Sequence, residues 1–424
     1  MPNNQRRNDL KALLVTAAVV TLCVSAAAQT FKVLYNFTNG TDGGGVYGGV
    51  VMDKQGNLYG TTSGGGAYGY GTVFELSPNS DGTWTETVLH SFMLNDPEGQ
   101  QPQCTLVLDA AGNLYGTAAN GSPYNSGTAF ELSPGSAGWT LTVLYDFCAQ
   151  SSCSDGSAPL PGFTMDGHGN LYGAGGGGAI GSGAIVELSP GSTGWTEKVL
   201  YSFGANNWIA GAIPTGRLVF DAAGDIYGTT YWGGDLPCGS NKVGCGTVYG
   251  LRNTSAGWKE SVLHKFGTIH GDGEYPTGDP LALDPKGNLY GTTPIGGGTE
   301  CANGSGCGTV FEVTRTGSHR SESIIHNFGT GTNGFAPAPG LVFDGAGNAY
   351  GTTDYSWPGC QCGTVFKLTP TSQGGWQYAV LHTFNGLDGD LPSAPLMVDG
   401  NGNLYGATIL GGAGGDGVVF EITP

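Results

Sequence analysis

The sequence predicts an all-β protein: a seven-bladed β-propeller of four-stranded blades, closed by an N-terminal strand that completes the last blade. Three observations lead to this prediction. Glycine makes up 80 of 424 residues, one short phrase recurs seven times, and the two ends of the chain carry complementary strands. Because each interior glycine costs a helix about 1 kcal/mol relative to alanine, long helices are disfavoured. Hydrophobic residues reach 39% and charged residues only 11%, which indicates a folded chain.

The recurring phrase is Asn-Leu-Tyr-Gly or a close variant, and its tyrosines stand 55 to 63 residues apart. A period of this length is typical of solenoids and propellers. The tyrosines of the seven copies are Tyr59, Tyr115, Tyr172, Tyr227, Tyr290, Tyr350 and Tyr405.

Each repeat contains four strand-like segments, which we name A to D. Strand A is a short apolar run such as 106–109, strand B is the Tyr-Gly phrase, strand C is typified by 71–76 and strand D by 84–92. All are rich in β-branched and aromatic residues and are bounded by glycine, proline, asparagine, aspartate and serine, as β-strands usually are.

The ends of the chain distinguish a closed ring from an open array. Residues 31–37 form a lone D segment, and residues 417–423 form a final C segment that lacks its D partner. Pairing the two completes seven sets of four strands, within the usual range for propellers. An open solenoid would need atypical capping repeats, and none is visible in the sequence.

The segment from Gly56 to Pro78, with G-N-L-Y-G-T-T, a glycine-rich loop and G-T-V-F-E-L-S-P, resembles the GloVer tandem repeat of exported bacterial proteins. The resemblance covers essentially the whole chain after residue 28. It implies no established activity and no catalytic residues. That family is known for variable C-terminal anchoring segments, and we expect none here because Pro424 lies inside the repeat pattern. The A–B portion is also similar, more weakly, to the NHL-type propeller phrase.

The first 28 residues are predicted to be a cleaved secretory signal peptide. A basic start, an apolar run from Ala12 to Val24 and the small residues before Gln29 match the pattern of such signals. A membrane anchor is the alternative, but the run is short for one. We therefore expect residues 29–424 to form a single propeller domain, secreted or periplasmic, without a membrane span.

Eight of the cysteines form close pairs in the sequence, which in an exported protein predicts local disulfides. A zinc site is the weaker alternative, because the pairs lie far apart and no H-x₃₋₅-H partner follows them. Cys104 is expected to be free, and the Cys360–Cys362 ring would be the tightest. The expected pairs are Cys148–Cys153, Cys238–Cys245, Cys301–Cys307 and Cys360–Cys362.

The net charge is −18, and the chain after residue 28 carries 32 acidic and 12 basic residues. Such a surface repels phosphate backbones, so nucleic acid is not an expected partner. A neutral glycan or a protein is the expected ligand, and the protein is expected to be a monomer.

Side chains that recur in every repeat are expected to be structural. An aspartate stands four residues before each strand B, with glycine in the third intervening position, and this predicts a tight A–B hairpin. Histidine alternates with tyrosine at one position of strand D, and tryptophan recurs at another, which indicates packing. The aspartates are Asp53, Asp109, Asp166, Asp221, Asp284, Asp344 and Asp399.

Five acidic residues precede the Gly-x-x-Pro or related phrase that leads into strand A, and we expect them at the mouth of the central channel. Turn chemistry is one interpretation; a cation or polyol site, with calcium as the candidate ion, is the other, and no further cofactor is expected. The series of acidic residues at this position of the repeat is interrupted at Ala210. The acidic residues are Asp42, Glu98, Asp155, Asp272 and Asp388.

Strand alternation places the long B–C and D–A loops on one face, where binding sites on rigid scaffolds usually lie. Aromatic residues on these glycine-rich loops suit sugar rings or protein side chains, although packing within the loops is the alternative. The candidate ligand-binding residues are Trp208, Tyr231, Trp232, Tyr355 and Trp357.

These observations favour an exported binding or interaction module for a carbohydrate or a surface protein. One alternative is an extracellular glycosidase or lyase that uses the channel carboxylates, since such enzymes need two positioned carboxylates. A structural surface protein is the other. No Ser-His-Asp set, metal motif or phosphate loop is legible in the sequence.

Overall fold

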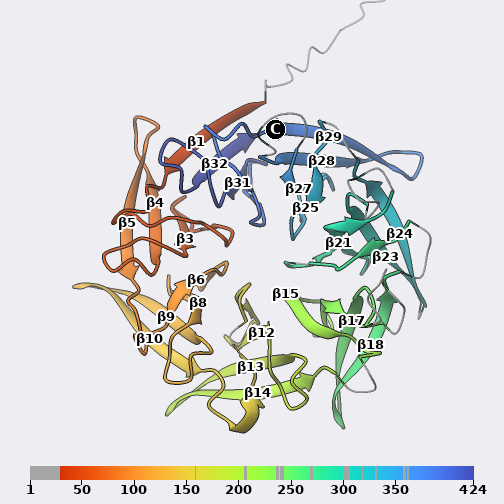
Figure 1. Cartoon of the computed structure of the whole chain (residues 1–424), viewed down its shortest axis with the longest axis horizontal. Coiled ribbons are helices and arrows are strands. Elements are labelled where there is room, and N and C mark those ends of the chain that lie inside the picture. The colour runs from red at the N-terminus through yellow and green to blue at the C-terminus, as the bar shows by residue number, and fades with distance from the viewer. Residues whose placement is uncertain are drawn as a thin grey trace, which may run out of the picture.

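The computed structural model describes residues 29–157, 159–204, 208–234, 238, 243–267, 271–277, 279–298, 301, 306–317, 319–329, 332–356, 360 and 362–424. In these residues the strands form seven blade sheets arranged as a ring around a central axis, and one further sheet of two strands (Figure 1). The protein is thus a seven-bladed β-propeller, as predicted. The expected signal peptide and Trp357 lie outside the described residues.

Each blade is an antiparallel sheet whose strands A to D follow one another from the centre outward. Blade 1 contains β30 (Met397–Val398), β31 (Leu404–Ala407), β32 (Val418–Thr423) and β1 (Thr30–Asn36). Blade 2 contains β2 (Val51–Met52), β3 (Leu58–Thr62), β4 (Thr72–Pro78) and β5 (Trp84–Ser91). Blade 3 contains β7 (Val107–Leu108) with β6 (Gln100–Pro102), then β8 (Leu114–Asn120), β9 (Thr128–Gly135) and β10 (Gly138–Asp146).

Blade 4 contains β11 (Thr164–Met165), β12 (Leu171–Gly175), β13 (Ala184–Gly191) and β14 (Gly194–Ser202). Blade 5 contains β15 (Ala212–Phe220), β16 (Ile226–Trp232), β17 (Thr247–Thr254) and β18 (Gly257–Lys265). Blade 6 contains β20 (Ala282–Leu283), β21 (Leu289–Thr293), β23 (Thr309–Thr316) and β24 (His319–Asn327), beside the short pair β19 (Gly273–Glu274) and β22 (Ile295–Gly296). Blade 7 contains β26 (Val342–Phe343) with β25 (Phe335–Pro337), then β27 (Ala349–Tyr355), β28 (Thr364–Pro370) and β29 (Trp376–Thr383). A single 3₁₀ turn, η1 (Ser151–Cys153), is the only helical element in the described part of the chain.

The ring is closed by the N-terminal strand, as predicted. β1 pairs antiparallel with β32, from Thr30 opposite Thr423 to Asn36 opposite Val418. The same strand contacts the preceding blade, because the ring of Phe31 stacks on His382 of β29 with centroids 3.7 Å apart. Blade 1 is therefore built from both ends of the chain (Figure 1).

The A–B hairpin has the predicted aspartate turn in every blade. In blade 2, Asp53 Oδ1 accepts hydrogen bonds from the backbone N–H groups of Gln55 and Asn57, and Oδ2 accepts from the side-chain amide of Asn57 at 2.9 Å. Gly56 has φ = 89°, a left-handed conformation that glycine adopts without a steric penalty. The corresponding glycines of the other six turns have φ between 81° and 90°. The repeated aspartates are therefore structural.

Hydrophobic clusters fill the spaces between neighbouring blades. The predicted packing role of the strand D tryptophans is confirmed: Trp84, Trp139, Trp195, Trp258 and Trp376 each pack against such a cluster. Trp139 of blade 3, for example, has its ring 6.1 Å from that of Tyr59 in blade 2.

In six blades the histidine or tyrosine of strand D lies near one position of strand D in the next blade. Where that position is aromatic the rings stack, as His326 does on Tyr378 with centroids 4.1 Å apart. Where it is glutamate, one carboxylate oxygen, Oε1, is buried and has no hydrogen-bond partner in the described residues. Burial raises the pKa of each of these glutamates to about 7, and they are Glu86, Glu197, Glu260 and Glu322.

All four predicted disulfides are present, and Cys104 is free as expected. The Cys104 thiol is buried, its Sγ accepts a hydrogen bond from the backbone N–H of Thr117 at 3.2 Å, and burial raises its pKa. Within the described ranges, no helix is long and apolar enough to cross a membrane.

Candidate functional site

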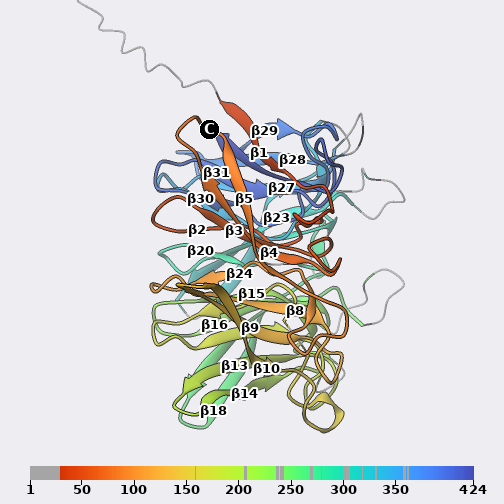
Figure 2. The ribbon, with the colours of Figure 1, turned by 90° about the vertical axis from the view of Figure 1, so that its left-hand side faces the viewer.

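One face of the propeller carries the exposed apolar side chains. Seen from the side, the strands run between two faces of the ring (Figure 2). All of the large hydrophobic residues that are exposed in the described part of the chain lie on D–A or B–C loops or at the strand ends that adjoin them. They are Tyr47, Tyr68, Met93, Leu94, Tyr124, Leu160, Ile180, Ile209, Ile213, Tyr355, Leu387 and Leu410. This distribution agrees with an interaction surface on the face formed by these loops.

Three of the predicted ligand-binding residues come together on this face, at blade 5. Trp208 precedes β15 and lies almost parallel to Trp232, with ring centroids 6.1 Å apart and an interplanar angle of 15°. Tyr231 is 5.9 Å from Trp232 and stacks in turn on Tyr275, at 4.9 Å. We call these four residues the aromatic row. All four residues are half-buried.

The backbone that carries Trp208 is held in an uncommon conformation. Trp208 has φ = 64°, in the left-handed region that bulky residues rarely adopt. Its carbonyl accepts hydrogen bonds from the N–H groups of Gly211 (2.9 Å) and Gly234 (3.1 Å), which fix this turn. A Cβ at Gly233 would lie 2.4 Å from the Cα of Gly211, so the two loops can approach this closely only because residue 233 is glycine. Strain of this kind often accompanies functional sites.

Tyr275 is contributed by the next blade and was not expected from the sequence. The predicted disulfide Cys238–Cys245 lies beside it, and the backbone N–H of Tyr275 donates to the carbonyl of Cys245 at 2.8 Å. The sequence does contain a signal for Tyr275, because it is the residue before proline in one of the Gly-x-x-Pro phrases. At five of these phrases the residue before proline has positive φ, and it has φ = 57° at Tyr275.

Tyr355 does not join the aromatic row. It lies at the end of β27 in blade 7, where its ring stacks on Phe335 at 5.3 Å, and it is 38% exposed. Trp357, the other candidate ligand-binding residue of this loop, lies outside the described residues.

The five predicted acidic residues contact strand D or the turn that follows it. Asp155 accepts from the Tyr145 hydroxyl at 2.9 Å, and Asp42 accepts from the backbone N–H of Thr38 at 2.9 Å. The remaining three lie 3.1–3.2 Å from strand D histidines, in the pairs Glu98–His90, Asp272–His264 and Asp388–His382. These partners belong to the outer part of each blade, which corrects the expected position at the channel mouth. These contacts agree with the turn interpretation.

The central channel is lined by other residues. Two cavities of about 220 and 360 Å³ are formed by the inner strands and the loops that lead into them. Their charged residues are Arg217 and Asp279, which form an ion pair at 2.9 Å that joins blades 5 and 6. Both side chains are largely buried, so these charges compensate each other.

One cluster in the described residues has donor atoms suited to a metal ion. The ligand atoms of His264, Asp272 and Glu322 lie within 4.8 Å of one another. A second group contains Cys238, Cys245 and Glu274, but its cysteines are joined in a disulfide and offer no thiolate. In the first group Asp272 is buried and Glu322 Oε1 is inaccessible, so this carboxylate pair cannot reach a polysaccharide substrate. Calcium at the acidic loops stays a prediction.

Sequence comparison identifies the repeat. The model of the Gloeobacter/Verrucomicrobia repeat matches residues 18–241, 144–358 and 238–424, which together span nearly the whole chain. The chain belongs to this family. The GloVer resemblance is thereby confirmed, and the overlapping matches follow the tandem blades of the propeller. No curated protein is similar enough in sequence to count as a match.

Solved structures are similar in fold. A fungal alcohol oxidase of the AA5 family in complex with copper has a TM-score of 0.52 and 14% identity, over 93% of this chain and 76% of the oxidase. The extracellular domain of a hybrid two-component system from B. thetaiotaomicron has a TM-score of 0.51 and 11% identity, over 92% of this chain and 39% of that one. At such low identities the likeness shows the propeller fold alone.

Proposed function

We propose that this member of the Gloeobacter/Verrucomicrobia repeat family is an extracellular binding module that recognises a neutral glycan through its aromatic row. The main support is the row itself: four adjacent, half-buried aromatic residues from two blades, on the face that carries the exposed apolar side chains. Aromatic faces bind the apolar faces of sugar rings, while indole N–H and phenol O–H groups can bond sugar hydroxyls.

The rigidity of the row also supports binding. The turn at Trp208 is fixed by two backbone hydrogen bonds, and Tyr275 is held by a backbone hydrogen bond to Cys245, which is joined to Cys238 by a disulfide. A loop that is ordered before binding loses less conformational entropy when the ligand arrives. The row therefore combines hydrophobic area with a low ordering cost, which is the combination expected of a binding site.

The experiment is a glycan array followed by titration of the best ligand, with cleavage of polysaccharides assayed in parallel. Because removing one central aromatic residue typically costs a site about 2 kcal/mol or more, Trp232→Ala and Trp208→Ala should each weaken binding at least tenfold. Trp139→Ala is the matched control: this tryptophan packs between blades 2 and 3, so its loss should lower stability and leave affinity unchanged.

Two results would contradict the proposal. If both loop variants bind like the wild type, the ligand binds elsewhere. If the protein cleaves a polysaccharide that it binds, the enzymatic alternative replaces the binding module.

A further inference from the structure

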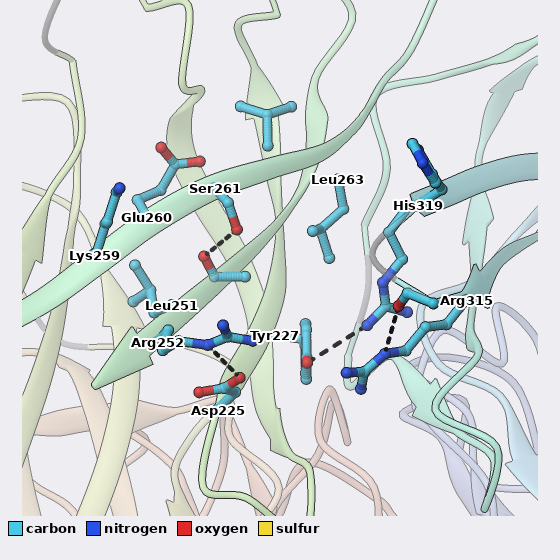
Figure 3. A pocket seen from close by; sticks show the side chains of 14 residues that line it. Asp225, Tyr227, Leu251, Arg252, Lys259, Glu260, Ser261, Leu263, Arg315 and His319 are labelled. Carbon is cyan, nitrogen blue, oxygen red and sulfur yellow. Dashed lines mark hydrogen bonds and ion pairs between the residues drawn. The ribbon is translucent and has the colours of Figure 1, made fainter. Parts of the chain in front are cut away.

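A pocket on the opposite face of blade 5 is separate from the aromatic row. It measures about 790 Å³ and opens between blades 5 and 6, near the A–B and C–D turns (Figure 3). Asp225, at one end of the pocket, precedes the first residue of β16, whereas Trp232 is the last residue of the same strand. The strand thus runs from this pocket to the aromatic row. Pockets of this volume commonly hold small molecules.

Two departures from the repeat create the pocket. Strand C carries a glutamate or a lysine at one position in the other six blades, but Gly250 in blade 5. In blades 4, 6 and 1 this glutamate accepts a hydrogen bond from the strand B tyrosine, as Glu312 does from Tyr290 at 2.8 Å. Strand D carries tryptophan at another position in five blades, but Arg320 in blade 6. A carboxylate and an indole are therefore missing from one place between two blades.

The pocket gathers positive charge in an acidic protein. Four of the 12 lysine and arginine residues after residue 28 line it. They form two cross-strand pairs, with Arg252 directly opposite Lys259 in blade 5 and Arg315 directly opposite Arg320 in blade 6. Like charges directly opposite each other destabilise a sheet. In blade 2 the corresponding pairs are neutral: Ser77 with Thr85 and Pro78 with Trp84.

The acidic residues nearby do not balance these four cations. Asp225 forms an ion pair with Arg252 at 3.0 Å. Glu260 also borders the pocket, but it follows Lys259 in β18 and so points to the other face of the sheet. There, burial raises the pKa of Tyr201 in blade 4, and the neighbouring Glu260 raises it further. Positive charge therefore remains in excess.

Arg320 lies deepest among these cations. Its Nη1 donates to the carbonyl of Gly287 at 2.6 Å, and its guanidinium lies 5.4 Å from the ring centre of Tyr227. Burial is the main cause that lowers its pKa; repulsion from the neighbouring Arg315 lowers it further, whereas Tyr227 and Asp221 act in the opposite direction. An anion between the two arginines would relieve this repulsion.

We infer that this pocket binds a compact carboxylate-bearing saccharide, such as a short oligomer of a uronic acid. Guanidinium groups match carboxylates with paired hydrogen bonds, and the side chain of Leu263 supplies apolar wall. The Ser261 hydroxyl donates to the carbonyl of Gly250 at 3.3 Å and can accept a hydrogen bond from a sugar hydroxyl. An extended polyanion is disfavoured because the surrounding surface is strongly negative. The inference does not depend on the proposed role of the aromatic row.

The test is calorimetric titration with digalacturonic acid, with a neutral disaccharide, a sulfated disaccharide and inorganic phosphate as comparison ligands. Digalacturonate should bind at least tenfold more tightly than each comparison ligand, and its affinity should fall as the salt concentration rises. Gly250→Glu and Arg320→Trp restore the residues of the other repeats and should each reduce this affinity at least tenfold. Lys54→Ala, which removes an exposed cation from a distant A–B turn, should not change it.

The folding of the variants is checked by thermal melting. A Cβ at Gly250 would lie 3.1 Å from the Tyr227 ring, so that ring must shift slightly. If either restoring variant unfolds, Lys259→Thr replaces it in the test. This substitution at an exposed position introduces the threonine found in blades 2, 3 and 4, and it should weaken binding severalfold. The inference is overturned if digalacturonate does not bind, or if the folded variants bind it with wild-type affinity. It is also overturned if phosphate, the sulfated disaccharide or the neutral disaccharide binds more tightly than digalacturonate.

Discussion

Replacing Glu260 with glutamine should make the protein more stable at pH 7.5 and change little at pH 4.5. Burial raises the pKa of this carboxyl group to about 7 from an ordinary value near 4.5, and its Oε1 has no hydrogen-bond partner in the described residues. Because the folded state holds a proton that the unfolded chain releases, the contribution of Glu260 to the free energy of unfolding falls as the pH rises from about 4.5 to about 7. Above pH 7 the contribution is constant.

The size of the effect follows from the pKa. Each pKa unit corresponds to about 1.36 kcal/mol, which gives an upper value of about 3 kcal/mol for a shift of this size. The side chain is only part-buried, and solvent screening reduces this to about 1–2 kcal/mol. Glutamine resembles the protonated carboxyl group in shape and carries no charge at any pH, so it should recover this amount near neutral pH.

The assay is urea unfolding of the wild type and Glu260→Gln at pH 4.5 and pH 7.5. Each pair is compared at the same pH, because other groups titrate in this interval; burial lowers the pKa of His326 to about 4, for example, with the opposite effect on stability. A difference between wild type and variant that is the same at both pH values would refute the reasoning.

Three further predictions concern the fold. Deleting residues 29–38 removes β1 from blade 1 and should lower the melting temperature severely, whereas an unchanged melting temperature would contradict closure of the ring by β1. Asp109→Ala removes an acceptor of three hydrogen bonds of 2.8–2.9 Å in the A–B turn of blade 3 and should cost about 2–3 kcal/mol in urea unfolding; a cost below about 0.5 kcal/mol would show that the turn does not need it. Alkylation of the non-reduced exported protein, followed by mass mapping, should label Cys104 alone and only after unfolding, and labelling of all nine cysteines after residue 28 would refute the four disulfides.

The fold could be predicted from the sequence because its determinants are local and repeated. The aspartate and glycine of each A–B turn lie within a few residues of each other, and their hydrogen bonds form inside one hairpin. The same holds for the disulfides, whose cysteines are at most seven residues apart. The closing strand was predictable because the ends of the chain carry strands that no single repeat completes.

The sites depend on contacts between blades, and here the sequence was less informative. Trp208 and Trp232 belong to one blade and were expected together, but Tyr275 comes from the next blade. Asp155, which precedes the phrase that leads into strand A, was expected at the mouth of the channel, yet its bond to Tyr145 keeps it at the outer end. The basic pocket arises from two departures from the repeat, Gly250 and Arg320, which are visible when the repeats are aligned; only the packing of blades 5 and 6 shows that they line one space.

The most direct test of the central claim is a crystal structure of the protein with the tightest-binding neutral glycan from the array. The proposed function predicts a sugar ring in contact with the aromatic row, against Trp208, Trp232 or Tyr275. A glycan bound in the central channel, or anywhere away from the row, would contradict it.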